Sequence, residues 1–161
     1  MIVVSDTSCL CYLALIGREG LLRELYHEVV VPPAVAAELA RGAATLPAIQ
    51  RMLDASWLIV RTLNHSERAA ELLEEVDAGE AEAIALYEEL KADLLLVDDM
   101  DARELARKLG IARIGLLGVF LDARKSGVLN EPLRPVFESL LEHGFRASRS
   151  FVERLLKEAG E

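Results

Sequence analysis

Aromatic side chains, cysteines and long apolar runs are all scarce in this chain of 161 residues. Phe, Trp and Tyr together make up only 5% of it, so a core must consist mainly of Leu, Val, Ile and Ala. No apolar run approaches the ~18 residues that a membrane-spanning helix needs. The apolar first segment lacks a basic leader and a small-residue cleavage site, and Asp6 interrupts it, which argues against a secretory signal. The protein is expected to be cytoplasmic and to have no membrane partner.

Two cysteines and three histidines leave little material for thiol or imidazole chemistry. Cys9 and Cys11 lie two residues apart in a predicted helix and therefore point to different faces. We interpret them as core or near-core thiols, and not as a disulfide or a metal-binding pair. His27, His65 and His143 fall in polar segments, where surface positions are expected, and share no spacing typical of metal ligands. A catalytic site in this chain would have to use other side chains.

Basic residues are too few for a broad surface that binds nucleic acid. The chain has 18 Lys and Arg against 27 Asp and Glu, which gives a net charge of −9 and a pI of about 4.9. Such a balance argues against an extended basic surface that contacts phosphates. Two interpretations stay open: the acids gather where a metal neutralises them, or the chain does not bind nucleic acid. Solubility of a helical surface explains most of the acids under either interpretation.

The pattern of apolar segments predicts alternating strands and helices. Hydrophobic residues make up 52% and charged residues 28%, which is typical of a globular domain with one core. The predicted strands are 2–5, 28–31, 57–60, 94–97 and 111–114. The predicted helices are 7–16, 18–25, 33–41, 46–55, 66–75, 79–91, 99–109, 116–125, 133–143 and 148–158. This alternation predicts a single α/β domain over residues 1–161, with three α/β/α layers around a mainly parallel sheet and two closing helices at about 133–158.

Acidic residues follow two of the predicted strands. Asp6 comes after the first strand and Asp98 after the fourth, with Asp99 and Asp101 close behind. Ligands of parallel sheets bind at the carboxyl ends of the strands, so neighbouring strands would direct Asp6 and Asp98 into one crevice. Two buried like charges are costly without a cation between them, and oxygen ligands suit Mg²⁺ or Mn²⁺. The simpler interpretation of Asp6 or Asp99, each taken alone, is a helix N-cap.

Two predicted helices carry further acids. Glu38 lies on a stretch of alanine and leucine that has little surface to spare, although a solvated edge position is the favoured interpretation of this residue taken alone. Glu80 lies near the apolar stripe of the helix that begins at Gly79, so it is expected to face inward toward a partner or a metal. Glu82, Glu88 and Glu89 are interpreted as lying on the exposed face of this helix, with Glu82 well off the stripe.

Several spaced segments resemble the PIN-domain family, a group of small α/β nucleases with an acidic centre. The opening strand ends in Val4-Ser5-Asp6-Thr7-Ser8, which is similar to the family's first acid and the small hydroxyl residue after it. The further segments that resemble the family's acid-bearing elements are, in chain order, Val31–Leu39, Gly79–Leu86 and Leu94–Asp99. Two later segments, Asp101–Ala106 and Gly115–Phe120, resemble a poorly characterised prokaryotic PIN-like subgroup. The order and spacing of the segments carry the resemblance.

The resemblance implies a Mg²⁺- or Mn²⁺-dependent ribonuclease, which hydrolyses RNA phosphodiesters and is often the toxin of a VapBC-type toxin–antitoxin pair. It implies an RNA substrate, an antitoxin protein as partner and a homodimer. The acids that it assigns to catalysis are Asp6, Glu38, Glu80 and Asp98. Of these, Asp6, Glu80 and Asp98 are the expected metal ligands. The secondary candidates are Ser8, which would position a water or a phosphate oxygen, and Glu82, Asp99 and Asp101.

Two departures from the family pattern favour an alternative. The third acid is Glu80 where many relatives have Asp, and Asp98-Asp99 stands where many have Thr-x-Asp or Thr-x-Asn. The alternative is a non-catalytic PIN-like module that binds protein or nucleic acid. A phosphotransfer protein with an acceptor Asp is a weaker reading, because no supporting Lys follows a later strand. If RNA binds, the candidates for a basic rim are Arg41, Arg103 and Arg107. Each can also be a surface helix residue, and that interpretation is favoured.

Overall fold

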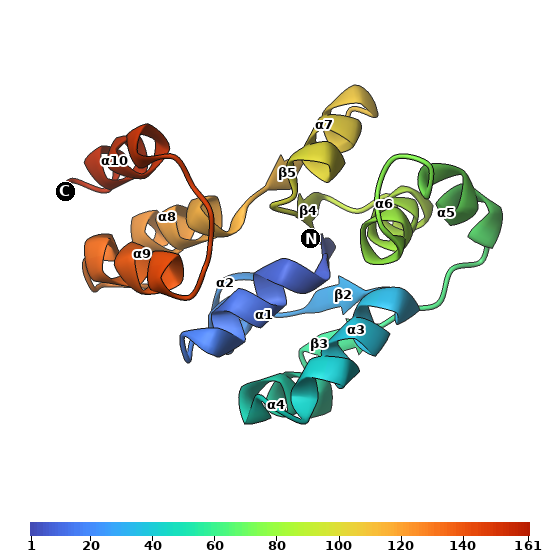
Figure 1. Ribbon diagram of the computed structural model, residues 1–161, viewed down its shortest axis with the longest axis horizontal. Helices are drawn as coiled ribbons and strands as arrows, with labels where there is room; N and C mark the ends of the chain where they lie inside the picture. Colours follow the sequence, from blue (N-terminus) through green and yellow to red (C-terminus); the bar gives the residue numbers. More distant parts are fainter.

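Five short parallel strands form the central sheet of the computed structural model, which describes residues 1–161 (Figure 1). The strands are β1 (Val3–Ser5), β2 (Val29–Val31), β3 (Leu58–Val60), β4 (Leu94–Leu96) and β5 (Arg113–Ile114). Their order across the sheet is β3-β2-β1-β4-β5, and every neighbouring pair is parallel. All five predicted strands are confirmed.

Ten helices surround the sheet, and each predicted helix is confirmed to within about three residues at either end. They are α1 (Thr7–Leu15), α2 (Leu21–Tyr26), α3 (Pro33–Ala43), α4 (Pro47–Asp54), α5 (Ser66–Leu72), α6 (Ala78–Leu90), α7 (Met100–Lys108), α8 (Leu116–Ser126), α9 (Leu133–Glu142) and α10 (Arg149–Glu158). None of them has the length and apolar character that a membrane crossing requires.

Local sequence signals set several of the helix ends. Pro33 and Pro47 occupy the first turns of α3 and α4, where a missing backbone N–H costs nothing. The Asp99 carboxylate accepts a hydrogen bond from the backbone N–H of Ala102 at 3.0 Å and caps α7. Gly127 ends α8 in the left-handed conformation, with φ of 82°. These signals lie within a few residues of the ends that they set, which is why the helices were predictable.

The sheet separates two hydrophobic clusters and so forms the middle of three α/β/α layers, as predicted. Successive strand side chains point to opposite faces: Val3 and Leu96 belong to the larger cluster, Val4 and Leu95 to the smaller. The larger cluster takes its other side chains from α1 to α4 and α8 to α10, and the smaller from α5 to α7. Both clusters are mainly aliphatic, in keeping with the low aromatic content.

The strand order reverses between β1 and β4. From β1 the chain adds β2 and β3 on one side, then returns to place β4 and β5 on the other side. Ser5 lies opposite Leu96 in the register of the pair, and the backbone N–H of Asp6 donates to the carbonyl of Leu96 at 3.0 Å. The residues that follow β1 and β4 therefore meet at a topological switch point, where ligands of open α/β sheets bind.

Candidate functional site

Asp6 is both a helix N-cap and a buried acid at the switch point. Its carboxylate accepts hydrogen bonds from the backbone N–H of Cys9 at 3.2 Å and from the Ser8 hydroxyl at 3.1 Å. The side chain is only 2% exposed. Burial, together with the negative charge of Asp98, raises the pKa of Asp6 to about 7, although the hydrogen bond from Cys9 acts in the opposite direction. The capping and the functional interpretation thus apply to the same residue.

Asp98 extends from the end of β4 toward the start of α8. Its carboxylate accepts a hydrogen bond from the backbone N–H of Leu116 at 3.0 Å and one from the Cys9 thiol at 3.0 Å. Burial raises the pKa of Asp98, and these hydrogen bonds partly offset the rise. Gly115 permits this approach, because a Cβ there would lie 2.6 Å from an Asp98 oxygen.

The expectation that Asp6 and Asp98 share one crevice is wrong in one respect. The two acids lie close enough for the charge of Asp98 to raise the pKa of Asp6, but they line different hollows. The reason is that Leu116 and Cys9 draw the Asp98 carboxylate toward α8 and away from the hollow beside Asp6.

Glu80 is held at the start of α6 by a capping box with Asp77. The Asp77 carboxylate accepts from the backbone N–H of Glu80 at 2.9 Å, and the Glu80 carboxylate accepts from the backbone N–H of Asp77 at 3.3 Å. Burial raises the pKa of Glu80 to about 7, and the charges of Asp77, Asp99 and Asp6 add to the rise. Glu80 therefore faces the other acids, as predicted from its position near the apolar stripe.

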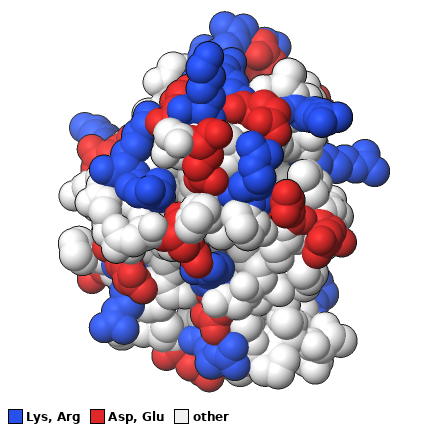
Figure 2. Space-filling model, turned by 90° about the vertical axis from the view of Figure 1, so that its left-hand side faces the viewer, with Lys and Arg blue, Asp and Glu red and all other residues white.

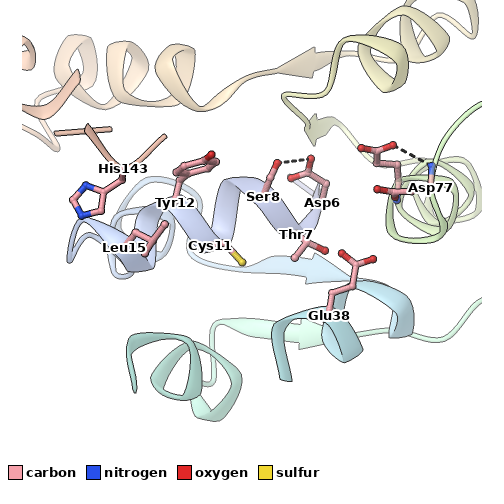
Figure 3. Close-up of a pocket in the computed structure, with 10 residues that line it drawn as sticks. Asp6, Thr7, Ser8, Cys11, Tyr12, Leu15, Glu38, Asp77 and His143 are labelled. Atoms are coloured by element: carbon pink, nitrogen blue, oxygen red, sulfur yellow. Dashed lines mark hydrogen bonds between the residues drawn. The ribbon is translucent and has the colours of Figure 1, made fainter. Parts of the chain in front are cut away.

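Glu38 is half-buried on α3 and lies against the first turn of α6. Gly79 makes this contact possible, since a Cβ at that position would lie 2.6 Å from the Glu38 Oε1 atom. Figure 3 shows Glu38 reaching toward Asp6 and Thr7 at the start of α1. Glu38 thus joins Asp6 and Glu80 from a different helix.

These acids line a cavity of about 400 Å³ at the switch point (Figure 3). Three of the four predicted catalytic acids take part in it, and Asp98 lies behind it. The lining residues are Asp6, Thr7, Ser8, Cys11, Tyr12, Leu15, Glu38, Asp77, Glu80 and His143. The cavity thus joins an acidic end, where α1 meets α3 and α6, to a less charged end beside His143 and Leu15 (Figure 3).

The chemistry of this cavity fits a divalent cation. The hydroxyl oxygen of Thr7 is buried there without a hydrogen-bond partner, next to carboxylates whose pKa values are raised by burial. No three His, Cys, Asp or Glu side chains stand close enough to form a finished set of ligands. Mg²⁺ binds proteins through one or two carboxylates and retains several waters, so it does not need a finished set. The residues present therefore suit a partly hydrated Mg²⁺ or Mn²⁺ ion.

The secondary candidates differ in their surroundings. The Ser8 hydroxyl donates a hydrogen bond to Asp6. Asp99 caps α7, and Asp101 is exposed in the first turn of the same helix. Asp99 and Asp101 line a shallow acidic hollow that Glu80 also lines. The interpretation of Glu82 as an exposed residue is wrong. Glu82 is half-buried and accepts a hydrogen bond from the backbone N–H of Ala34 at 3.3 Å, because α6 packs against the start of α3.

Of the arginines proposed for a basic rim, only Arg103 lies beside an acid of the site. Its positive charge acts on Asp98 and opposes the rise in the pKa of that acid. Arg107 pairs with Glu104 at 2.7 Å on the surface of α7, and Arg41 is exposed in the last turn of α3. Arg41 and Arg107 are therefore surface helix residues, which was the favoured interpretation.

Sequence reasoning missed six residues that line the cavity: Thr7, Cys11, Tyr12, Leu15, Asp77 and His143. Asp77 stands three residues before Glu80, which is the spacing of a capping box, so this signal was available. His143 was assigned to the surface. It is exposed, but it also lines the cavity because the turn after α9 approaches α1, a proximity that no local pattern reveals.

Replacing Gly79 with Ala is expected to displace the Glu38 carboxylate while leaving the fold intact. The new Cβ would lie too close to Glu38 Oε1, and this atom is the far end of a flexible side chain that can move. In a helix, Ala is favoured over Gly by about 0.5–1 kcal/mol, so the free energy of unfolding should be unchanged or higher. Urea denaturation and RNA cleavage measure the two effects. A variant with full activity would show that the position of Glu38 does not matter.

The fold and the site together define a class: parallel α/β domains with carboxylates gathered at the switch point of the sheet. The model of the PIN-domain family DUF3368 matches residues 2–161, and the chain belongs to this family. PIN domains are generally nucleases and generally use divalent metal ions. The resemblance seen in the acid-bearing segments is thereby confirmed.

A solved structure supports the same fold. The chain is similar to a PilT N-terminus domain protein, SSO1118, from the hyperthermophilic archaeon Sulfolobus solfataricus P2, with a TM-score of 0.58 and 23% sequence identity. The similarity covers 74% of this chain and 90% of that protein. At this level of identity it bears on the fold alone. A search of curated proteins gave no match.

Proposed function

We propose that the protein is a Mg²⁺- or Mn²⁺-dependent ribonuclease that hydrolyses phosphodiester bonds of single-stranded RNA. The observation that carries the proposal is the buried carboxylate of Asp6, whose pKa is raised to about 7 at the switch point of a PIN fold. Glu38 and Glu80 line the same cavity. Binding of a cation would stabilise a pocket with this much negative charge, and the same cation would neutralise charge on a phosphodiester substrate.

Each acid has a distinct part in the proposed mechanism. A divalent cation would neutralise charge on the scissile phosphate and lower the pKa of the attacking water. Asp6, held in one orientation by Cys9 and Ser8, would be the central ligand of the cation. Glu80 and Asp98 would complete the ligand set directly or through waters. Glu38 faces the cavity and would accept a proton from the attacking water. The new P–O bond would form as the bond to the 3′ oxygen breaks, and that oxygen would take a proton from solvent to become the 3′-hydroxyl.

A toxin role in a toxin–antitoxin pair, with an antitoxin protein as partner and a homodimer as the active form, belongs to the same proposal and rests on the resemblance to VapBC-type proteins. Action in the cytoplasm is also proposed. Both cysteines are free thiols, which suits a reducing compartment. Analytical ultracentrifugation of the purified chain, alone and with the product of a neighbouring small gene, measures the assembly.

Two observations favour the alternative, a non-catalytic PIN-like module. Both oxygens of Asp98 already accept hydrogen bonds within the protein, and no finished set of metal ligands is present. Such a module would bind a protein or a nucleic acid without cleaving it. The two proposals differ in one measurable product, the shortened RNA.

The test is incubation of mixed-sequence single-stranded RNA with the protein in Mn²⁺, in Mg²⁺ and in EDTA. The expected result is cleavage with either metal and none in EDTA, leaving 5′-phosphate and 3′-hydroxyl ends. Cleavage that persists in EDTA would exclude the proposed metal centre. Intact RNA in every sample, together with measurable Mn²⁺ binding by calorimetry, would favour the non-catalytic module.

A further inference from the structure

A second hollow, of about 260 Å³, opens beside Asp98 and is lined by three arginines. Arg103 comes from α7, Arg113 from β5 and Arg146 from the turn between α9 and α10. Arg103 and Arg113 come from successive elements, whereas Arg146 follows 33 residues after Arg113, so the tertiary fold brings its side chain to the other two. Three guanidinium groups around one hollow are unexpected in a protein with nine more acidic than basic residues.

None of the three arginines has a salt-bridge partner within 4.0 Å, whereas Arg51 and Arg134 elsewhere on the surface are paired with glutamates. The Nε atom of Arg113 is buried without a hydrogen-bond partner. Arg103 donates only to the carbonyl of Val97, at 3.4 Å. A guanidinium that lacks a partner is available to bind a carboxylate or phosphate with two parallel hydrogen bonds.

The acids near the hollow do not satisfy these arginines. Asp98 is the only acid in the lining, and Leu116 and Cys9 already donate to its oxygens. The positive charge of Arg113 acts on Glu104, but the Glu104 carboxylate already forms an ion pair with Arg107. The hollow therefore retains positive charge that an external anion can neutralise.

The distribution of charge along the chain agrees with this. Residues 113–161 contain eight Lys and Arg and seven Asp and Glu, so the whole of the net negative charge resides in the first 112 residues. Figure 2 shows the side of the molecule formed by the C-terminal helices, where many Lys and Arg side chains lie in the upper part, interspersed with Asp and Glu. A polyanion would approach the acidic cavity most easily from this side.

The hollow and the acidic cavity share a wall. Tyr12 lines the cavity and Phe145 lines the hollow, and their rings contact edge to face with centroids 5.1 Å apart. Cys9 contacts one acid of each: its backbone N–H donates to Asp6, which lines the cavity, and its thiol donates to Asp98, which lines the hollow. A strand of RNA that places one phosphate at Asp6 can extend over this wall to place a neighbouring phosphate at the arginines.

We propose that Arg103, Arg113 and Arg146 form a binding site for an RNA backbone phosphate that flanks the scissile bond. This proposal rests on the proposed ribonuclease function for the identity of the ligand. It explains how a protein with a net charge of −9 can hold a polyanion: the cation neutralises the scissile phosphate, and the arginines neutralise its neighbour. Each arginine–phosphate contact also makes binding depend on salt.

The experiment measures binding of a fluorescein-labelled 12-nucleotide single-stranded RNA in EDTA, by anisotropy at several NaCl concentrations. The double variant Arg113→Gln/Arg146→Gln is compared with Arg23→Gln/Arg61→Gln, which removes two exposed and unpaired arginines elsewhere. The first variant should bind about 10-fold more weakly at low salt. The plot of the logarithm of its binding constant against the logarithm of the salt concentration should be less steep by about 1.4. The control should bind like wild type. Arg146→Glu alone, at an exposed position, should weaken binding while melting at the wild-type temperature.

The outcomes separate this proposal from the ribonuclease proposal, because binding in EDTA does not require turnover. Equal losses in the two double variants, or no loss in either, would overturn the phosphate site even if wild type cleaves RNA in Mn²⁺. Selective loss in Arg113→Gln/Arg146→Gln with no cleavage in Mn²⁺ would support the phosphate site and overturn the ribonuclease. Weaker binding by Arg146→Glu, with an unchanged melting temperature, supports the site independently of the folding of the double variant.

Discussion

Asp6→Asn is expected to abolish metal-dependent RNA cleavage and, at pH 8 without metal, to make the protein more stable. The substitution removes a carboxylate that is buried and whose pKa is raised to about 7. Loss of a residue that only supports a metal ligand typically costs 10- to 100-fold in activity, so loss of a central ligand should cost at least about 100-fold. Asn is as good an N-cap as Asp and can still accept from Cys9, so α1 should remain intact.

The gain in stability distinguishes a functional acid from a structural one. An ionised Asp6 is costly in the metal-free fold, so the neutral amide should raise the free energy of unfolding at pH 8 by an amount on the order of a few kcal/mol. Asp101→Asn is the matched control, since it makes the same chemical change at an exposed position of α7. RNA cleavage at the wild-type rate by Asp6→Asn would remove the proposed metal centre, and a large loss of stability would mean that Asp6 is only structural.

The second large effect is a fall in the stability of the metal-free protein as the pH rises. The pKa of Asp6 is about 7 in the fold, against a reference value of 3.8. Between these values the folded state binds more protons than the unfolded chain, so the free energy of unfolding decreases with rising pH and levels off above about pH 7. Glu80, whose pKa is also raised to about 7, contributes in the same direction. Urea denaturation at pH 5, 6, 7 and 8 in EDTA measures the decrease.

Addition of a divalent cation should reverse this decrease at pH 8. Metal binding requires ionised carboxylates, so Mn²⁺ should stabilise the fold at pH 8 and have little effect at pH 5. At a free concentration 100 times the Kd, the expected stabilisation at pH 8 is about 2.7 kcal/mol. The effect should be absent in Asp6→Asn. Stability that does not change between pH 5 and 8, or an equal effect of Mn²⁺ on the variant, would contradict the coupling of metal and protons at Asp6.

The elements of the fold were predictable because their signals are local. Apolar segments such as Leu94–Leu96 mark buried strands, and residues such as Pro33 and Asp99 mark helix starts within one turn. Asp6 and Asp98 were found for a related reason: each follows directly after an apolar strand of a parallel sheet. These predictions needed no knowledge of which strands are neighbours.

The errors concern side chains whose surroundings come from distant segments. Glu82 lies off the apolar stripe of α6 and was expected in solvent, but the start of α3 packs over it and donates to its carboxylate. Asp98 was expected to face Asp6, but the N-terminus of α8 draws its carboxylate away. In both cases a helix terminus supplies unpaired N–H groups to an acid of another element, an attraction that hydrophobic periodicity does not encode.

The sequence by itself determined the strands, the helices and the acids that lie at strand ends and in helix first turns, because short-range packing and capping decide these features. Only the tertiary structure decided that β4 lies beside β1, that Glu38 rests on Gly79 and that three arginines meet at one hollow. The physical reason is that the free energy of such contacts depends on distance and burial in space, and segments separated by dozens of residues acquire both only when the chain has folded.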